Sequence, residues 1–90
     1  MTVKEMFDKH DDEFLKFERI PAYARKHPRP DLCGMLYLHD RFGGTGDAVV
    51  AAEHDEVWLA WDADGLDEED VIYLSRCGIR LDRAGLCMFV

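Results

Sequence analysis

The sequence predicts an α+β fold, in which a small antiparallel sheet of three or four strands has the helices packed on one face. Helix-starting signals precede two apolar segments in the first half of the 90 residues, while β-branched runs and a hairpin signal lie in the second half. A chain of this length builds one hydrophobic core, so we expect a single domain, residues 1–90. The expected order of elements is α-α-β-α-β-β.

The first expected helix runs from Thr2 to about Ile20. Apolar side chains recur there at three- and four-residue spacing, which is typical of an amphipathic helix. Thr2 and Glu5 have the spacing of a capping box at its start, and Pro21 is expected to end it. His10 falls on the apolar stripe, so we expect a histidine in the core or at its boundary.

The second expected helix runs from Leu32 to about Phe42, after a connector that contains a basic cluster at 25–29. Pro30 and Asp31 open it, because proline and an early acid both suit a first turn. Its polar side is narrow, so we expect most of this helix to be buried. The glycine-rich segment 43–46 should end it.

The strands are expected in the second half of the chain. Residues 48–52 suit either a short strand or the approach to the next one, whereas residues 56–61 have the composition of a strand. Trp58 and Trp61 differ in parity, so one should enter the core while the other is exposed or contacts a partner.

The remaining elements are a third helix and a hairpin. A turn at 62–65 leads to Asp67, which caps a helix that continues to Cys77 and stops at Gly78. The last twelve residues predict a hairpin with strands at 79–82 and 86–90 and a three-residue loop that ends in glycine.

Negative charge is concentrated in one segment of the chain. Nine carboxylates and no Lys or Arg lie between residues 53 and 70, whereas the first 30 residues hold seven Lys and Arg against six Asp and Glu. An apolar strand runs through this segment, which indicates a folded acidic surface. Such a surface repels nucleic acid and anionic membranes and attracts basic partners. The candidate partner-binding residues are Glu53, Asp55, Glu56, Asp62, Asp64, Asp67, Glu68, Glu69 and Asp70.

The three cysteines Cys33, Cys77 and Cys87 lie in apolar contexts, and none belongs to a C-x-x-C pair. Buried free thiols in a reducing compartment fit this usage, although a Cys77–Cys87 disulfide across the hairpin is the alternative. The N-terminus lacks the apolar run of a signal peptide, and no stretch approaches the length of a membrane span. We therefore expect a cytoplasmic protein with no membrane partner.

Two fragments invite a metal site, and neither completes one. Asp62-x-Asp64-Gly65 resembles the middle of a calcium-binding loop, but the first and twelfth positions of that loop fall on Ala60 and Val71, which carry no carboxylate. In a strand, the side chains of His54 and Glu56 lie on one face and that of Asp55 lies on the other. Only two ligands would then converge, whereas a structural metal takes four. We expect no metal and no cofactor.

No arrangement of side chains predicts catalysis. The glycine-rich segment 43–46 lacks the lysine and hydroxyl residue of a phosphate-binding loop. Ser75 is the only serine in the chain and has no histidine at helical spacing. Cys33 and His39 are six residues apart on one helix and do not meet. We therefore do not expect an enzyme.

Four segments of the chain resemble a group of small bacteriophage- and prophage-encoded proteins of unassigned function. They are Arg29-Pro30-Asp31-Leu32, Ala51–Leu59, Ser75–Arg80 and Leu86–Val90. The resemblance implies a bacterial cytoplasmic setting and an accessory role for a phage.

These observations favour a non-enzymatic phage accessory protein that binds a host or phage protein through its acidic face. Its sharpest form is an inhibitor of a nucleic-acid-handling defence system, of the anti-CRISPR or DNA-mimic type. The alternative is a small structural or assembly protein, for example a homodimer, that oligomerises through its C-terminal strand. Binding that weakens steeply with salt would favour the first, and a concentration-dependent oligomer the second.

Overall fold

The computed structural model describes residues 1–44 and 46–89, within which there are three α-helices and four strands. Thr45 of the expected helix-ending segment and Val90 of the expected last strand lie outside the described residues. None of the helices in this part of the chain is long and apolar enough to cross a bilayer. The elements are α1 (Val3–Lys9), α2 (Pro30–Phe42), β1 (Val49–Glu53), β2 (Glu56–Leu59), α3 (Glu68–Arg76), β3 (Ile79–Asp82) and β4 (Gly85–Phe89).

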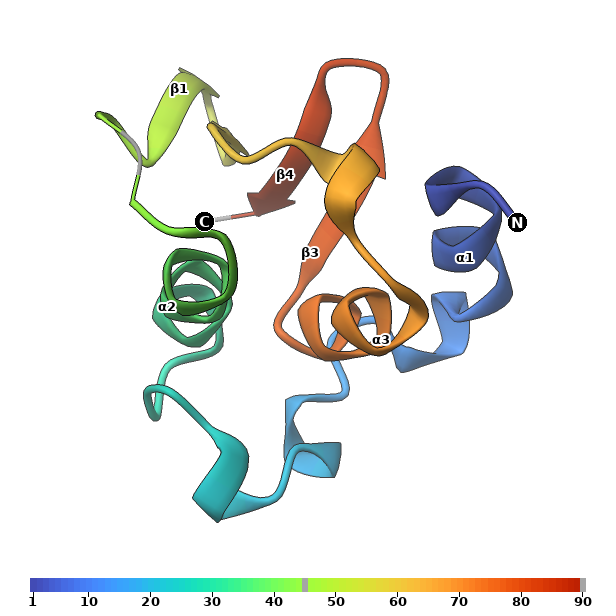
Figure 1. Ribbon diagram of the computed structural model, residues 1–90. Helices are drawn as coiled ribbons and strands as arrows, with labels where there is room; N and C mark the ends of the chain where they lie inside the picture. The colour runs from blue at the N-terminus through green and yellow to red at the C-terminus, as the bar shows by residue number, and fades with distance from the viewer. Residues whose placement is uncertain (45, 90) are drawn as a thin grey trace.

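The predicted α+β class is confirmed. In Figure 1, α2 and α3 lie below the strands and α1 lies at the right, beside β3. All four strands are antiparallel to their neighbours. The segment 48–52, which the sequence left open, contributes most of β1, so the order of elements is α-α-β-β-α-β-β.

The first helix is much shorter than predicted, because α1 ends at Lys9 and not near Ile20. Short 3-10 turns follow at Asp11–Glu13, Phe17–Arg19 and Ala22–Ala24. The predicted end at Pro21 is therefore also wrong, since that residue only precedes the last of these turns.

Contacts with α3 explain this path. The buried carboxylate of Glu13 accepts a hydrogen bond from Arg76 at 2.9 Å and also pairs with Arg19. The amide of Leu15 donates to the carbonyl of Ser75 at 3.0 Å, with Leu15 at φ 63°. A right-handed helix cannot continue through a leucine in the left-handed region, so tertiary contacts override the apolar periodicity here.

The helix ends that have a local chemical cause are where the sequence predicts them. Thr2 and Glu5 form a reciprocal capping box at the start of α1, and Asp67 and Asp70 form another at the start of α3. The residue after the C-cap of α3 is Gly78 at φ 86°, a backbone conformation that favours glycine.

Helix α2 ends at Phe42 as predicted and begins at Pro30, two residues before the expected start, but it is less buried than expected. Only Cys33, Gly34 and Leu38 are buried, whereas Leu32 and Leu36 are 37% and 39% exposed. The helix approaches the sheet closely, because a Cβ atom at Gly34 would lie 2.6 Å from the side chain of Ile79.

The strand order in the sheet is β1-β2-β4-β3, so the last strand along the chain lies in the middle. It pairs with β2 on one side and with β3 on the other. The predicted hairpin is confirmed, with Asp82 opposite Gly85 and a shorter loop of Arg83 and Ala84. Strand β2 ends at Leu59, two residues earlier than expected.

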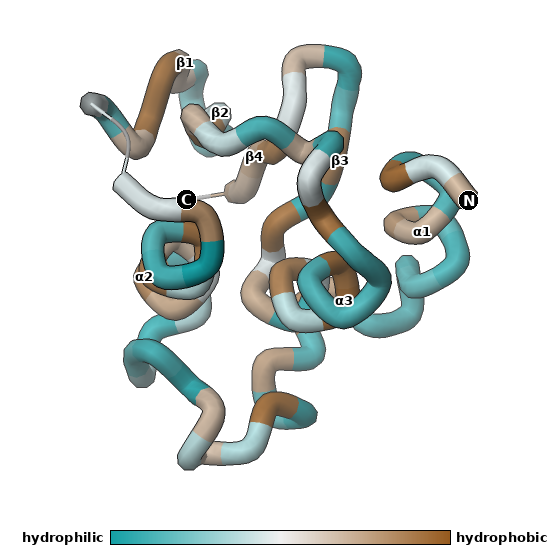
Figure 2. The backbone as a smooth tube through the Cα atoms, in the orientation of Figure 1, coloured by the Kyte–Doolittle hydropathy of each residue, from teal (hydrophilic) through white to brown (hydrophobic). Residues whose placement is uncertain are grey.

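The three helices cover one face of the sheet, here called the inner face. Leu59, Ile79, Leu86 and Met88 from the strands pack there in a common core with the helices. The helix residues of this core are Phe7, Leu38, Val71 and Leu74. In Figure 2 the apolar stretches of β3 and α3 face each other in the middle of the molecule.

The structure separates the two tryptophans. Trp61 belongs to the core, with 8% of its surface exposed, and its indole nitrogen donates to the carbonyl of Gly43 at 3.0 Å. Trp58 is partly exposed and lies on the face of the sheet opposite the helices. One tryptophan is therefore in the core and the other outside it, as predicted.

All three cysteines are free and buried, which confirms the expected state of the thiols and leaves no Cys77–Cys87 disulfide. Cys33 and Cys77 form a small second core with Ile20. The sulfur of Cys33 lies 3.2 Å from the hydroxyl of Tyr73, which itself donates to a backbone carbonyl of the N-terminal segment.

Candidate functional site

The face of the sheet opposite the helices carries a continuous set of polar and aromatic side chains. Cross-strand partners share a face, so Trp58 of β2, Cys87 of β4 and Arg80 of β3 form one row across three strands. Glu56 and Phe89 form the next pair along the same face. We call this surface the open face and define it by Glu53, Glu56, Trp58, Arg80, Asp82 and Phe89, with Cys87 beneath them.

Trp58 and Asp82 connect two strands of the open face that are not neighbours. The indole nitrogen of Trp58 donates to both carboxylate oxygens of Asp82, at 3.0 and 3.2 Å, across the intervening β4. Burial acts to raise the pKa of Asp82, but hydrogen bonds from Trp58 and from the amide of Ala84 outweigh it, so the pKa is below its ordinary value. The carboxylate is therefore held ionised and oriented.

Arg80 and Phe89 stack against each other in the open face. The guanidinium of Arg80 pairs with Glu56 at 2.8 Å and lies over the ring of Phe89, 4.5 Å from its centroid. Phe89 is 50% exposed. Arginine and aromatic side chains in this arrangement are the residues that most often dominate the binding energy of protein interfaces.

Cys87 lies under these side chains and is fully buried. Burial raises the pKa of its thiol to about 11, with the carboxylate of Asp82 adding to the effect and Arg80 opposing it. The thiol is therefore protonated near neutral pH. Because the thiolate is the reactive form, Cys87 lacks the properties of a catalytic nucleophile.

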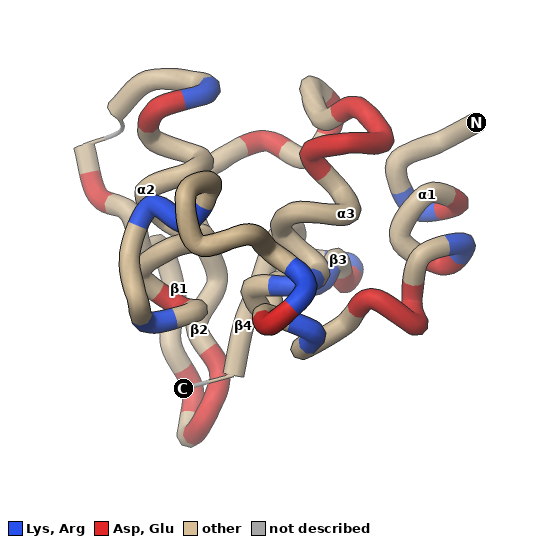
Figure 3. Tube along the Cα trace, turned by 90° about the horizontal axis from the view of Figure 1, so that it is seen from below, with Lys and Arg blue, Asp and Glu red and all other residues tan. Residues whose placement is uncertain are grey.

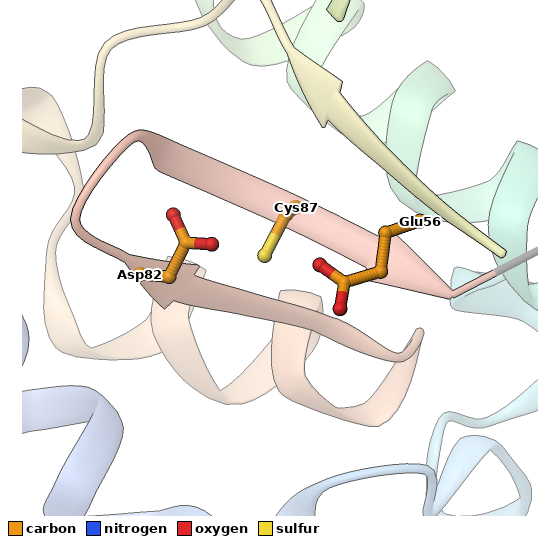
Figure 4. Close-up of side chains that lie close together, drawn as sticks. All are labelled: Glu56, Asp82 and Cys87. Carbon is orange, nitrogen blue, oxygen red and sulfur yellow. The ribbon is translucent and has the colours of Figure 1, made fainter. Parts of the chain in front are cut away.

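Glu56, Asp82 and Cys87 also bring three potential metal-ligand atoms within 4.8 Å of one another. Figure 4 shows the three side chains on the same side of the strands. Each carboxylate already has a protein partner, since Arg80 pairs with Glu56 and Trp58 occupies both oxygens of Asp82. A cation would have to displace the guanidinium and the indole, so the cluster is better described as an internally satisfied part of the open face.

The nine carboxylates singled out in the sequence do not form one surface. The first group lies at the end of the β1–β2 hairpin, and the second lies before and within the first turn of α3. Figure 3 shows these as separate regions of negative charge. The first group is Glu53, Asp55 and Glu56, and the second is Asp62, Asp64, Asp67, Glu68, Glu69 and Asp70.

Four of these nine carboxylates form ion pairs within the protein. Asp70 is 1% exposed and accepts a hydrogen bond from the hydroxyl of Tyr37, so it is not available to a protein partner. Its other neighbour is Arg41, which also pairs with Asp67. The remaining pairs are Glu68 with Lys9 and Glu56 with Arg80.

The other five are exposed and form no ion pair in the part of the chain that the structure describes. They are Glu53, Asp55, Asp62, Asp64 and Glu69. Glu53 lies opposite Glu56 and so belongs to the open face, and Asp55 follows it in the turn. The charge that a partner could use near the open face is thus carried by two unpaired carboxylates at its rim.

The two fragments considered as metal sites take other roles. The carboxylate of Asp62 accepts a hydrogen bond from the amide of Asp64 at 2.9 Å in a 3-10 turn, which agrees with the predicted turn. His54 lies in the β1–β2 turn at φ 38°, and not in a strand as the parity argument assumed. His10 is partly buried beside Glu68, which agrees with a boundary position.

Arg80, Asp82 and Phe89 were not predicted as components of a surface. The sequence does contain a pattern that points to these residues, because each alternates along its strand with a residue of the core. What local pattern could not show is that β2 and β3 lie on either side of β4, which brings these side chains together with Trp58. No family model, curated protein or solved structure matches this chain.

Proposed function

We propose that this protein is a non-enzymatic binding module that recognises a basic protein surface through its open face. The observation that carries the proposal is the half-exposed Phe89 stacked under Arg80, beside a partly exposed Trp58. An aromatic and arginine centre with a polar rim is typical of the energetically important part of a protein interface.

Charge supports a basic partner. Glu53 and Asp55 are exposed and unpaired at the rim, and the chain carries a formal net charge of −8. Complementary charge at a rim mainly accelerates association and excludes partners of the wrong sign. It also makes association weaken as salt concentration rises.

The resemblance to phage and prophage proteins supports an accessory role inside a bacterial host. The sharper version is inhibition of a nucleic-acid-handling defence system, in which carboxylates of this protein occupy a groove that otherwise binds phosphates. The unpaired acids of the hairpin and those before α3 would supply two separate contact points for such a groove.

The assembly alternative has less support. β4 is an internal strand, paired with β3 over residues 85–88 and with β2 over residues 87–89, so it offers little free edge for main-chain pairing with another chain. The exposed side chain of Phe89 is the part of this strand best placed to contribute to a dimer. Sedimentation of the parent and of Phe89→Ser over a wide concentration range tests that contribution.

The proposed function is tested by quantitative affinity capture from an extract of a bacterial host. The variants are Phe89→Ser for the aromatic centre and Glu53→Lys with Asp55→Lys for the rim. The matched control is Asp12→Lys with Glu18→Lys, which makes the same charge change at exposed positions of the N-terminal segment.

We expect a specific protein to be captured by the parent and the control and lost by both open-face variants. Its retention should also fall steeply between about 0.1 and 0.5 M salt. Equal capture by all four proteins, or capture indifferent to salt, would contradict the proposal.

A further inference from the structure

We propose that a basic, extended segment of the partner protein adds to the sheet as a fifth strand along β1. This inference rests on the proposed function, because it takes the same class of partner and specifies how it is held. Strand addition of this kind uses main-chain hydrogen bonds for affinity and alternate side chains for specificity.

Strand β1 is an unprotected edge. It is outermost in the sheet and pairs only with β2 among the described strands. All five of its residues are exposed, and Val50 is 63% exposed. Figure 2 shows β1 as an apolar stretch at the periphery of the molecule.

β1 lacks three of the residues that usually protect a sheet edge, namely lysine, arginine and proline. Its sequence is Val-Val-Ala-Ala-Glu. The opposite edge strand, β3, carries Arg80 and Asp82 and has α1 packed near it. The one irregularity of β1 is a register shift between Val49 and Ala51, near its start.

The backbone groups of Ala52 are placed to receive another strand. Glu53 and Glu56 close a two-residue turn, and such closing residues direct their backbone groups at each other. Those of Ala52, the next residue back, therefore point away from β2. An incoming strand would meet a main-chain donor and acceptor at this position.

Charge selects the occupant. Residues 42–75 contain no lysine or arginine. β1 ends at Glu53 and Asp55 lies in the turn after it, and both carboxylates are unpaired and exposed. A second copy of β1 would bring no lysine or arginine to this edge, so it would leave Glu53 and Asp55 unpaired. A segment with lysine or arginine flanking apolar residues would pair its charges there instead.

The edge is continuous with the open face. Ala51 lies opposite Trp58 and Glu53 lies opposite Glu56, so alternate side chains of an added strand would extend the same surface. One partner segment could thus use the edge and the open face together.

The test uses two synthetic probes. The first is an eight-residue peptide of alternating lysine and valine with blocked ends. The second is the same peptide with N-methyl groups on its two central residues. Adjacent amides of an extended chain point to opposite edges, so the second peptide keeps the charge but loses a main-chain donor on either edge.

We expect the first peptide to bind and to slow hydrogen exchange at the amide of Ala52, as followed by NMR. The N-methylated peptide should bind at least tenfold more weakly. Equal binding of the two peptides would show simple charge attraction and would overturn the inference. Absence of binding by the first peptide at millimolar concentration would also overturn it.

A variant pair tests the same point from the protein side. Ala52→Pro removes the outward amide without removing a bond to β2, because proline is tolerated where an edge amide faces solvent. Ala52→Val is the control. The proline variant should lose peptide binding and the valine variant should keep it.

Phe89→Ser separates this inference from the proposed function. The serine variant should still bind the short peptide at β1 while losing capture of the protein partner. If capture depends on Phe89 but the peptides fail to bind, the open face stands and strand addition is wrong. If the peptides bind but capture does not depend on Phe89, the proposed function is wrong.

Discussion

The indole nitrogen of Trp58 donates to the carboxylate of Asp82 across the strand that separates them. This contact ties β2 to β3 above β4 and fixes the orientation of two side chains of the open face. It also links the ionisation of Asp82 to the presence of the indole.

Replacing Trp58 with phenylalanine tests this link. The variant keeps an aromatic ring but removes the donor, so the pKa of Asp82 should rise toward its ordinary value of 3.8. We expect a loss of about 1–3 kcal/mol in the free energy of unfolding, because a partly buried carboxylate loses its partner. An NMR titration of the Asp82 side chain and a denaturant melt measure the two effects. Tyr23→Phe, at a side chain that is 91% exposed, should change neither.

Glu13 should make the stability depend on pH in the acid range. A hydrogen bond from Arg76, opposed by burial and helped by Arg19, lowers the pKa of Glu13 below its ordinary value of 4.5. Since the folded state has the lower pKa, the stabilisation is complete well above pH 4.5 and is lost as the pH falls below it.

The measurement is the difference in unfolding free energy between the parent and Glu13→Gln from pH 7 to pH 3. We expect the difference to be largest at neutral pH and to shrink toward acid. Other carboxylates with lowered pKa values, such as those of Asp67 and Glu68, cancel in this comparison. A difference that is constant over the whole range would contradict the assignment.

Met88 and Phe89 should differ sharply when each is replaced with alanine. Met88 is 1% exposed in the core, so Met88→Ala should cost about 2–5 kcal/mol of unfolding free energy. Phe89 is half exposed on the other face, and Phe89→Ala should cost about 1 kcal/mol or less. Deleting residues 88–90 should abolish the cooperative thermal transition, because β4 holds the sheet together. Similar melting curves for the two alanine variants would show that the faces are wrongly assigned.

The cysteines should react slowly with thiol reagents in the native protein. Burial raises the pKa of Cys77 well above its ordinary value and that of Cys87 to about 11, and Cys33 is fully buried. Labelling near pH 8 should accelerate strongly after denaturation, with all three thiols reacting. Rapid labelling of one cysteine in the native protein would indicate an accessible thiolate and contradict this description.

The parts of the fold that follow from neighbouring residues were predictable. Both capping boxes, the glycine after α3 and the C-terminal hairpin depend on residues at most a few positions apart. The first helix was not predictable in this way, because its early end depends on Glu13 meeting Arg76, 63 positions along the chain. Apolar periodicity alone could not reveal that contact.

The candidate site, like the fold, was predictable only in the part that depends on neighbouring residues. The sequence identified the acidic segment and Trp58, but not which acids remain free. The carboxylate of Asp70 is buried against Tyr37, whereas Asp55 stays exposed in a turn. The difference arises from packing between α2 and α3, which no local pattern reports.

The position of β4 also constrains when the protein can fold during its synthesis. The ribosome synthesises β2 and β3 before β4. These two strands do not pair with each other, because β4 lies between them in the sheet, so the sheet is incomplete until β4 is in place. Until then the nascent chain exposes extra strand edges and the apolar inner face of a divided sheet, which are features that promote aggregation. Folding of the sheet is therefore completed only after the segment 85–89 has left the ribosome.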